Sequence, residues 1–84
     1  MKRIYTLSSL KEGERCRVRG LLIDGKMRSR LSDLGLIRGT SVVCVQKSSS
    51  GDPTAFLIRG AVIALRKEDS SRVIVSPEQV RANS

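Results

Sequence analysis

The chain contains no histidine and no tryptophan, and only two cysteines, one tyrosine and one phenylalanine. Without histidine it lacks the commonest general base and the usual relay of a catalytic triad. Its glycines are isolated, so phosphate-binding loops of the GxxxxGKS/T and GxGxxG types are absent. The acidic residues are scattered, and only Glu68 and Asp69 are adjacent. The sequence therefore predicts a protein that is not an enzyme.

The two cysteines, Cys16 and Cys44, are far apart in the sequence, and there is no histidine to complete a zinc-ligand set. Both lie in segments that alternate polar and apolar residues, so we expect buried, reduced structural thiols. The sequence thus predicts no cofactor and no dedicated metal site. It leaves open only a weak contact of a divalent ion with the acidic positions.

The scarcity of aromatic side chains weakens two modes of binding. Proline-rich peptides dock in aromatic-lined grooves, and single-stranded nucleic acids stack their bases on aromatic rings. This chain offers only Tyr5 and Phe56 for either purpose. No apolar run approaches the ~20 residues that span a bilayer, and the N-terminus lacks the apolar stretch of a signal peptide. We therefore expect a cytoplasmic protein.

Acidic residues are also few, because 8 Asp and Glu stand against 16 Lys and Arg, which gives a formal net charge of +8. Such a charge favours an acidic protein, an anionic membrane surface or nucleic acid as partner. The basic residues are spread along the chain, so a purely solubilising role is an equal alternative. Nucleic acid is the weakest of the three partners, since only backbone contacts through the arginines would support it.

The pattern of apolar residues predicts a mainly β domain over residues 1–76 and a flexible tail over residues 77–84. The expected strands are short and end at turn residues; they comprise residues 15–23, 40–47, a hairpin over 54–66 that turns at Arg59 and Gly60, and 73–75. About five such strands with one short helix are typical of a small SH3-like barrel. We expect the sheet to close on itself, because closure removes exposed edges.

The most regular pattern is the segment DGKMRSRLSDLGLIRGT, residues 24–40. Asp24 is a suitable N-cap for a helix over residues 25–34. The apolar positions of this helix are spaced i, i+4 and i+7 and form a single stripe, which consists of Met27, Leu31 and Leu34. A helix this short is not stable alone. We therefore expect it to cover the open end of the barrel.

Glycines mark the end of this helix and the turn after it. Gly35 is expected to adopt the left-handed conformation of a Schellman motif, in which Leu36 folds back onto Leu31. Gly39 occupies the position of positive φ in a type II turn. The residues to which the sequence assigns a structural role are Leu31, Leu34, Gly35, Gly39 and Gly60.

Four segments together resemble, in order and spacing, the ferrous iron transport protein A (FeoA) family. They are LSSLKEGERCRVRGL, RSRLSDLGLIRGTSVVCV, SGDP and IRGAVIALRKEDSSRVIV, and they lie within residues 7–75. The resemblance implies an SH3-like barrel that acts as an accessory of FeoB-type ferrous iron permeases, which carry a cytosolic GTPase domain. It also implies a second role, because similar barrels are fused to iron-dependent repressors as regulatory domains.

The sequence therefore predicts a non-enzymatic accessory protein that binds and modulates an FeoB-type transporter, in the cytoplasm or at the inner face of the membrane. The alternative is a free-standing SH3-like regulatory domain that binds nucleic acid or an iron-dependent repressor. For the partner contact we expect a basic rim around a small apolar patch, formed by Arg28, Arg30, Leu36, Ile37 and Arg38. The basic face of the first long strand is the alternative surface, with Arg15, Arg17 and Arg19.

Overall fold

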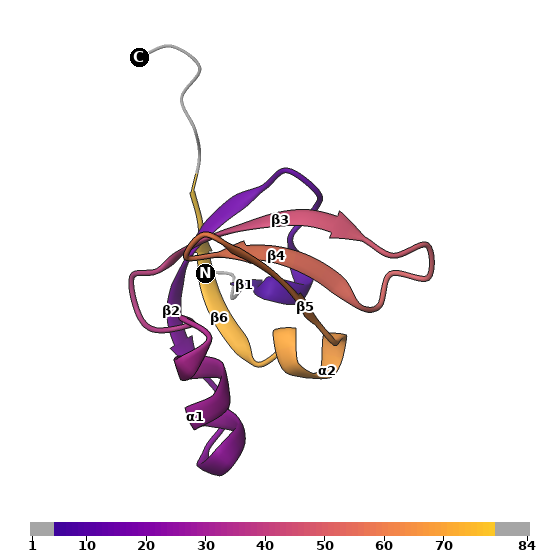
Figure 1. Cartoon of the computed structure of the whole chain (residues 1–84). Coiled ribbons are helices and arrows are strands. Elements are labelled where there is room, and N and C mark those ends of the chain that lie inside the picture. Colours follow the sequence, from indigo (N-terminus) through magenta and orange to yellow (C-terminus); the bar gives the residue numbers. More distant parts are fainter. Residues whose placement is uncertain (1–4, 79–84) are drawn as a thin grey trace, which may run out of the picture.

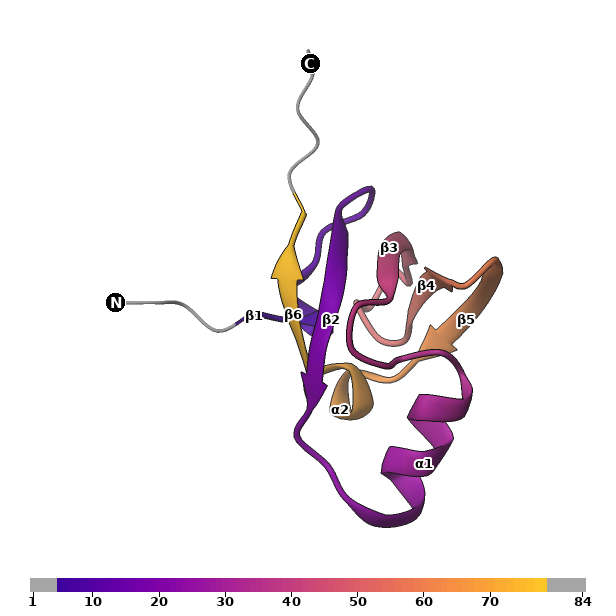
Figure 2. The same ribbon diagram turned by 90° about the vertical axis from the view of Figure 1, so that its left-hand side faces the viewer.

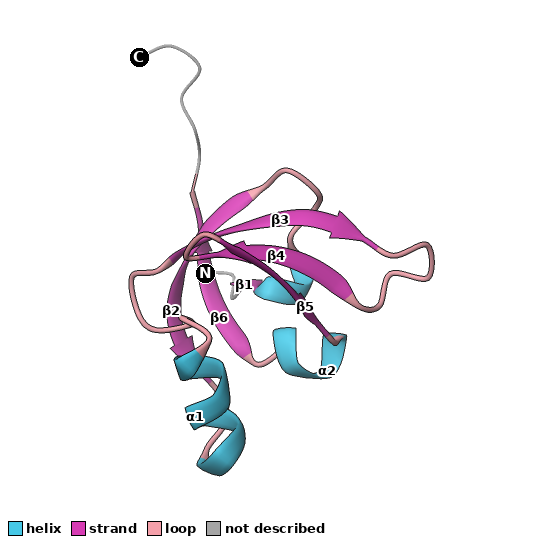
Figure 3. Cartoon of the chain, in the orientation of Figure 1, coloured by secondary structure: helices cyan, strands magenta, loops and turns pink. Residues whose placement is uncertain are grey.

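Six antiparallel strands dominate the protein in a computed structural model that describes residues 5–78 (Figures 1 and 3). Along the chain the elements are β1 (Tyr5–Thr6), the 3-10 turn η1 (Leu7–Ser9), β2 (Arg15–Leu21), α1 (Gly25–Asp33), β3 (Ser41–Lys47), β4 (Thr54–Ile58), β5 (Ala61–Leu65), α2 (Lys67–Ser70) and β6 (Val73–Pro77). The strand order is β1-β6-β2-β3-β4-β5. None of the helices within residues 5–78 is long and apolar enough to cross a membrane.

The sheet bends into two halves around one core, because β2 pairs with β3 only through residues 15–17 but with β6 as far as Leu21 (Figure 2). Alternation places every second side chain of β2 inside, so the arginines of this strand are exposed and Cys16 and Val18 are buried, as predicted. The other buried residues of the same core cluster are Leu7, Leu10, Leu31, Leu36, Val42, Cys44, Phe56, Ile58, Leu65, Val73 and Val75.

The mainly β fold with one short helix is confirmed, but the predicted closure of the sheet is wrong. Within residues 5–78 the sheet has two edges, β1 and β5, and they do not pair with each other. A sixth strand arises because Tyr5 and Thr6 pair with Val75 and Ile74 of β6. Because β1 pairs with β6, no strand within residues 5–78 lies on the outer side of β5.

The first long strand ends earlier than its apolar run indicates. β2 stops at Leu21, and Leu22 is 58% exposed, so the predicted extension of this strand to residue 23 is wrong. Asp24 occupies the N-cap position, but its carboxylate accepts no capping hydrogen bond. Gly25 follows with a φ of +74°, outside the right-handed helical region, which accounts for the missing contact.

The C-terminal end of α1 has the predicted geometry. The backbone N–H of Leu36 donates to the carbonyl of Leu31 at 3.1 Å, and that of Gly35 donates to Ser32 at 2.9 Å. These two bonds define the Schellman motif, and Gly35 has the required left-handed φ of +106°. The type II turn is also confirmed, because Gly39 has a φ of +93° and Thr40 donates to Ile37 at 3.1 Å.

The helix α1 stands at one end of the sheet, beyond the ends of β2 and β5 (Figure 2). Leu31 is its one buried residue, and Met27 and Leu34 pack partly buried against the core. At the other end of the chain, the predicted tail begins inside β6, since Pro77 belongs to this strand. Residues 79–84 of that tail lie outside the described residues.

Candidate interaction surface

The predicted basic rim on α1 is not a single cluster. Arg28 and Arg30 are separated by about 200° around the helix axis, so their side chains leave it on opposite sides. The Arg28 guanidinium donates to the carbonyls of Leu21 and Ile23, at 3.3 and 3.4 Å, and so holds the connection from β2 to α1. Arg30 instead faces β5 and α2. Both residues are exposed, but only Arg30 lies beside an open groove.

The predicted exposure of Leu36 is wrong, because this side chain is completely buried. The Schellman motif directs the residue after Gly35 back onto the helix and into the core. Ile37 is 47% exposed, and Arg38 is exposed at the following turn. Of the predicted apolar patch, Ile37 alone is therefore available to a partner.

Arg59, which was not predicted as a contact residue, packs on the C-terminal end of α1. It has a φ of +50° in the two-residue turn between β4 and β5, where Gly60 has a φ of +84°. A Cβ atom placed on Gly35 would lie 2.5 Å from Cδ of Arg59, so the alkyl chain of Arg59 covers this glycine. A cation here is favourable, because the C-terminal end of a helix carries partial negative charge.

The sequence already marks Arg59 as an unusual residue for its turn. Two-residue hairpin turns with positive φ at both positions strongly prefer Asn-Gly or Asp-Gly. An arginine at the first position therefore contradicts the local preference, and such positions commonly have a tertiary or functional reason. We call Ile37, Arg38 and Arg59 the helix-end surface.

An open groove of about 430 Å³ separates α1 from β5 and α2. The residues that line it define the α1 groove and are partly apolar and partly charged: Met27, Leu31, Leu34, Ile63, Ala64 and Leu65, with Arg30, Arg66, Glu68 and Asp69. The apolar stripe of the helix is thus only partly covered by the sheet. This leaves side chains of α1 and of an edge strand facing the same open space.

Half of the acidic side chains form hydrogen bonds or an ion pair with other residues of the chain. The carboxylates of Glu12, Glu14 and Asp52 accept backbone N–H groups of three lysines, at 2.7 to 2.8 Å. Glu78 forms an ion pair with Arg17 at 3.2 Å. By contrast, Arg17 and Arg28 are the only basic side chains with a hydrogen-bond acceptor within residues 5–78. Most of the basic side chains within residues 5–78 are instead exposed to the solvent.

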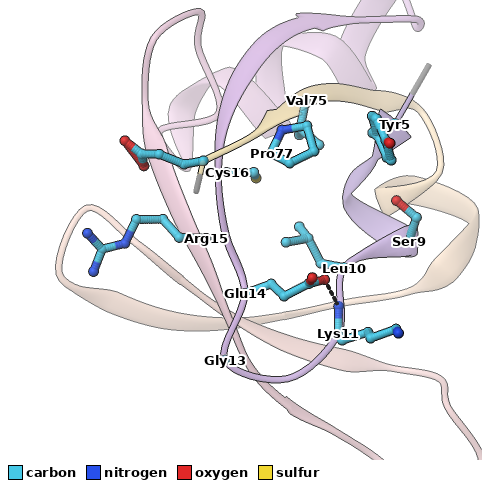
Figure 4. A pocket seen from close by; sticks show the side chains of 11 residues that line it. Tyr5, Ser9, Leu10, Lys11, Gly13, Glu14, Arg15, Cys16, Val75 and Pro77 are labelled. Atoms are coloured by element: carbon cyan, nitrogen blue, oxygen red, sulfur yellow. Dashed lines mark hydrogen bonds between the residues drawn. The ribbon is translucent and has the colours of Figure 1, made fainter. Parts of the chain in front are cut away.

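A second cavity, of about 620 Å³, lies where η1, the start of β2 and the end of β6 meet (Figure 4). Burial, with smaller contributions from Glu78, Cys44 and Glu14, raises the pKa of the Cys16 thiol to about 12. Burial also raises the pKa of Cys44. Both thiols are free and protonated at neutral pH, which makes them poor nucleophiles and poor metal ligands. Nowhere in residues 5–78 do three or more potential metal-ligating side chains gather.

The FeoA domain model matches residues 5–77. The chain belongs to the FeoA family. No curated protein matches it significantly. The family assignment confirms the resemblance read from the sequence, and it makes this FeoA-family chain a small protein related to ferrous iron transport.

Solved FeoA structures share the fold. The FeoA-like protein of Clostridium acetobutylicum is 27% identical over 100% of both chains, with a TM-score of 0.82. FeoA of Chlorobium tepidum is 28% identical over 94% of this chain and 75% of its own, with a TM-score of 0.84. FeoA of Stenotrophomonas maltophilia, an SH3 domain protein complexed with zinc, is 28% identical over 86% and 89%, with a TM-score of 0.78. The predicted SH3-like fold is thereby confirmed.

Proposed function

We propose that this FeoA-family protein is a cytoplasmic accessory of ferrous iron transport that binds and modulates the cytosolic GTPase domain of an FeoB-type transporter, at the inner face of the membrane. The family match over residues 5–77 is the observation that carries the proposal. A binding role is supported by the absence of histidine and of phosphate-binding loops, and by the excess of basic over acidic residues. A positive surface speeds association with an acidic partner and disfavours other partners.

The helix-end surface is the contact that we favour. Ile37 supplies an exposed apolar side chain, and Arg38 follows it directly. Arg59 is held against Gly35, two residues before Ile37, by the packing of its alkyl chain. An apolar centre with a charged rim is a common layout of transient interfaces. Arg30, on the groove side of α1, extends the positive charge toward β5.

The proposal is tested by titrating the purified GTPase domain of the transporter with this protein, in GDP and in a non-hydrolysable GTP analogue. Arg38→Glu should weaken binding several-fold at low salt, mainly through a slower association rate. Arg72→Glu is the matched control, because it makes the same charge change at an exposed residue outside the helix-end surface. Absence of binding by the unmodified protein in both nucleotides would refute the proposal.

A second comparison separates the two basic surfaces. Arg19→Glu changes the exposed face of β2 by the same charge. If Arg19→Glu weakens binding and Arg38→Glu does not, the partner binds the β2 face instead. Modulation is measured as the change in the GTP hydrolysis rate of the transporter domain when saturated with this protein.

A further inference from the structure

The outer edge of β5 offers unpaired backbone groups. Arg59 and Gly60 form a two-residue turn, so Ile58 and Ala61 are the hydrogen-bonded pair that closes the hairpin. Hydrogen-bonded and non-hydrogen-bonded pairs then alternate along the strand, so the N–H and C=O groups of Val62 and Ala64 point away from β4. Outside the strand ladder, no hydrogen bond among residues 5–78 involves residues 61–65. Figure 2 shows β5 as the outermost strand beside β4.

This edge lacks the features that usually prevent pairing. Residues 61–65, AVIAL, include no charged residue and no proline, whereas exposed edges are commonly protected by lysine, proline or a bulge. Val62 is 63% exposed. It stands directly opposite Leu57 of β4, which in turn stands opposite Val43 of β3. The outer face of the sheet therefore presents a row of aliphatic side chains that stops at β5 and that an added strand would continue.

Charge lies at both ends of the edge and not within it. Arg59 precedes β5, and Arg66 and Lys67 follow it; all three are exposed. On the inner side, a strand paired with β5 would place the residue opposite Ile63 toward the α1 groove, whose apolar lining includes Met27 and Leu34. The matching ligand is thus apolar in its middle and acidic at its ends.

A second copy of this chain is a poor occupant. Antiparallel self-pairing that joins Val62 of each copy to Ala64 of the other keeps both bonded residues within β5 and is centred on Ile63. This register puts Arg59 of each copy opposite Lys67 of the other, and like charges directly opposite each other are destabilising. The net charge of +8 on each copy adds to the repulsion.

We propose that the free edge of β5 binds an extended segment of a partner protein, β-branched in its middle and flanked by acidic residues, as a seventh antiparallel strand. Such strand addition takes affinity from backbone hydrogen bonds and specificity from alternate side chains. The inference concerns the chemistry of the bound segment and does not depend on which transporter domain this FeoA-family protein binds.

The test uses the full chain and the synthetic peptide Ac-EEVTVTVEE-NH2. Amide exchange measured by NMR should show rapid exchange at Val62 and Ala64 in the free protein and slow exchange at Ile63. Saturation with the peptide should slow exchange at Val62 and Ala64 by at least about tenfold. The control peptide Ac-EEGPGPGEE-NH2 has the same charge but cannot form a strand, and it should not protect these amides.

Two variants at one position test the backbone contact by fluorescence anisotropy of the labelled peptide. Val62→Pro removes an outward N–H but no bond to β4, and it should weaken binding by about fivefold to tenfold, the effect of one hydrogen bond. Val62→Thr keeps the N–H and should bind like the unmodified chain. Three results would each overturn the proposal. The first is equal binding of both peptides, and the second is binding of the acidic peptide without protection of Val62 and Ala64. The third is protection of these amides in the free protein through self-association. None of these results bears on binding to the GTPase domain.

Discussion

Alanine at Gly35 is expected to strain the end of α1 in two independent ways. The φ of +106° lies where a side chain is unfavourable, which costs about 1–2 kcal/mol for an L-residue. The new Cβ would also lie 2.5 Å from Cδ of Arg59 and 3.2 Å from Cγ2 of Ile58. Overpacking of this kind costs about 1–3 kcal/mol. Together the two effects should lower the free energy of unfolding by about 2–5 kcal/mol.

Thermal unfolding followed by circular dichroism measures this loss. In a domain of this size, 1 kcal/mol corresponds to about 4–8 °C in Tm, so Gly35→Ala should lower Tm by at least about 8 °C. Two glycines serve as controls, since a Cβ on either would meet no atom within 4 Å. Gly39→Ala, at a φ of +93°, should show only the backbone cost, and Gly20→Ala should change Tm little.

A double-mutant cycle isolates the contact with Arg59. Truncating that side chain removes Cδ and Cγ, the two atoms nearest to the new methyl group, while Cγ2 of Ile58 stays at 3.2 Å. Arg59→Ala should therefore cost less stability in the Gly35→Ala protein than in the unmodified one, with a coupling of about 0.5–3 kcal/mol. If Gly35→Ala and Gly39→Ala are equally destabilising and the cycle shows no coupling, the packing of Arg59 on Gly35 is refuted.

Three further substitutions test the turn at Arg59, the start of α2 and the buried thiol of Cys16. Arg59→Asn should raise the free energy of unfolding by about 0.5–1 kcal/mol, because asparagine adopts a left-handed φ more readily; a lower Tm would show that the lost packing on Gly35 outweighs the relief. Asp52→Ala removes the carboxylate that accepts the first N–H of α2 at 2.8 Å, and urea unfolding should show a loss of about 1 kcal/mol. Because burial raises the pKa of the Cys16 thiol from 9.0 to about 12, the unfolded chain loses this proton first, and stability should fall as pH rises above 9. Cys16→Ala should flatten that fall, and an unchanged pH profile would show that Cys16 does not cause it.

Features fixed by neighbouring residues were predicted well. The period of Met27, Leu31 and Leu34 located α1, and Gly35 marked its end, because a helix stripe and a left-handed cap each depend on a few consecutive residues. The same holds for the turn at Gly39. Alternation likewise assigned the inner and outer faces of β2, since it follows directly from strand geometry.

Features that depend on distant pairing were predicted poorly. β1 has two residues, too few for any pattern, yet its pairing with β6 sets which strands become edges. Leu22 continues an apolar run but is exposed, because β2 has already left the sheet at that point. The errors on α1 are different in kind, since the turn angle of a helix already separates Arg28 from Arg30, and the Schellman motif already directs Leu36 inward.

The contact between Gly35 and Arg59 could not be predicted from either sequence segment alone. Alone, Gly35 is a helix stop, and Arg59 is an unfavourable residue in a hairpin turn. In the fold each accounts for the other, because the missing side chain of Gly35 makes room for the alkyl chain of Arg59. The strained turn at the start of β5 is thereby packed on the end of α1. A partner strand on β5 and a partner surface at the helix end would consequently meet at the same residue, so Arg59→Ala should weaken binding of the acidic peptide as well as of the transporter domain.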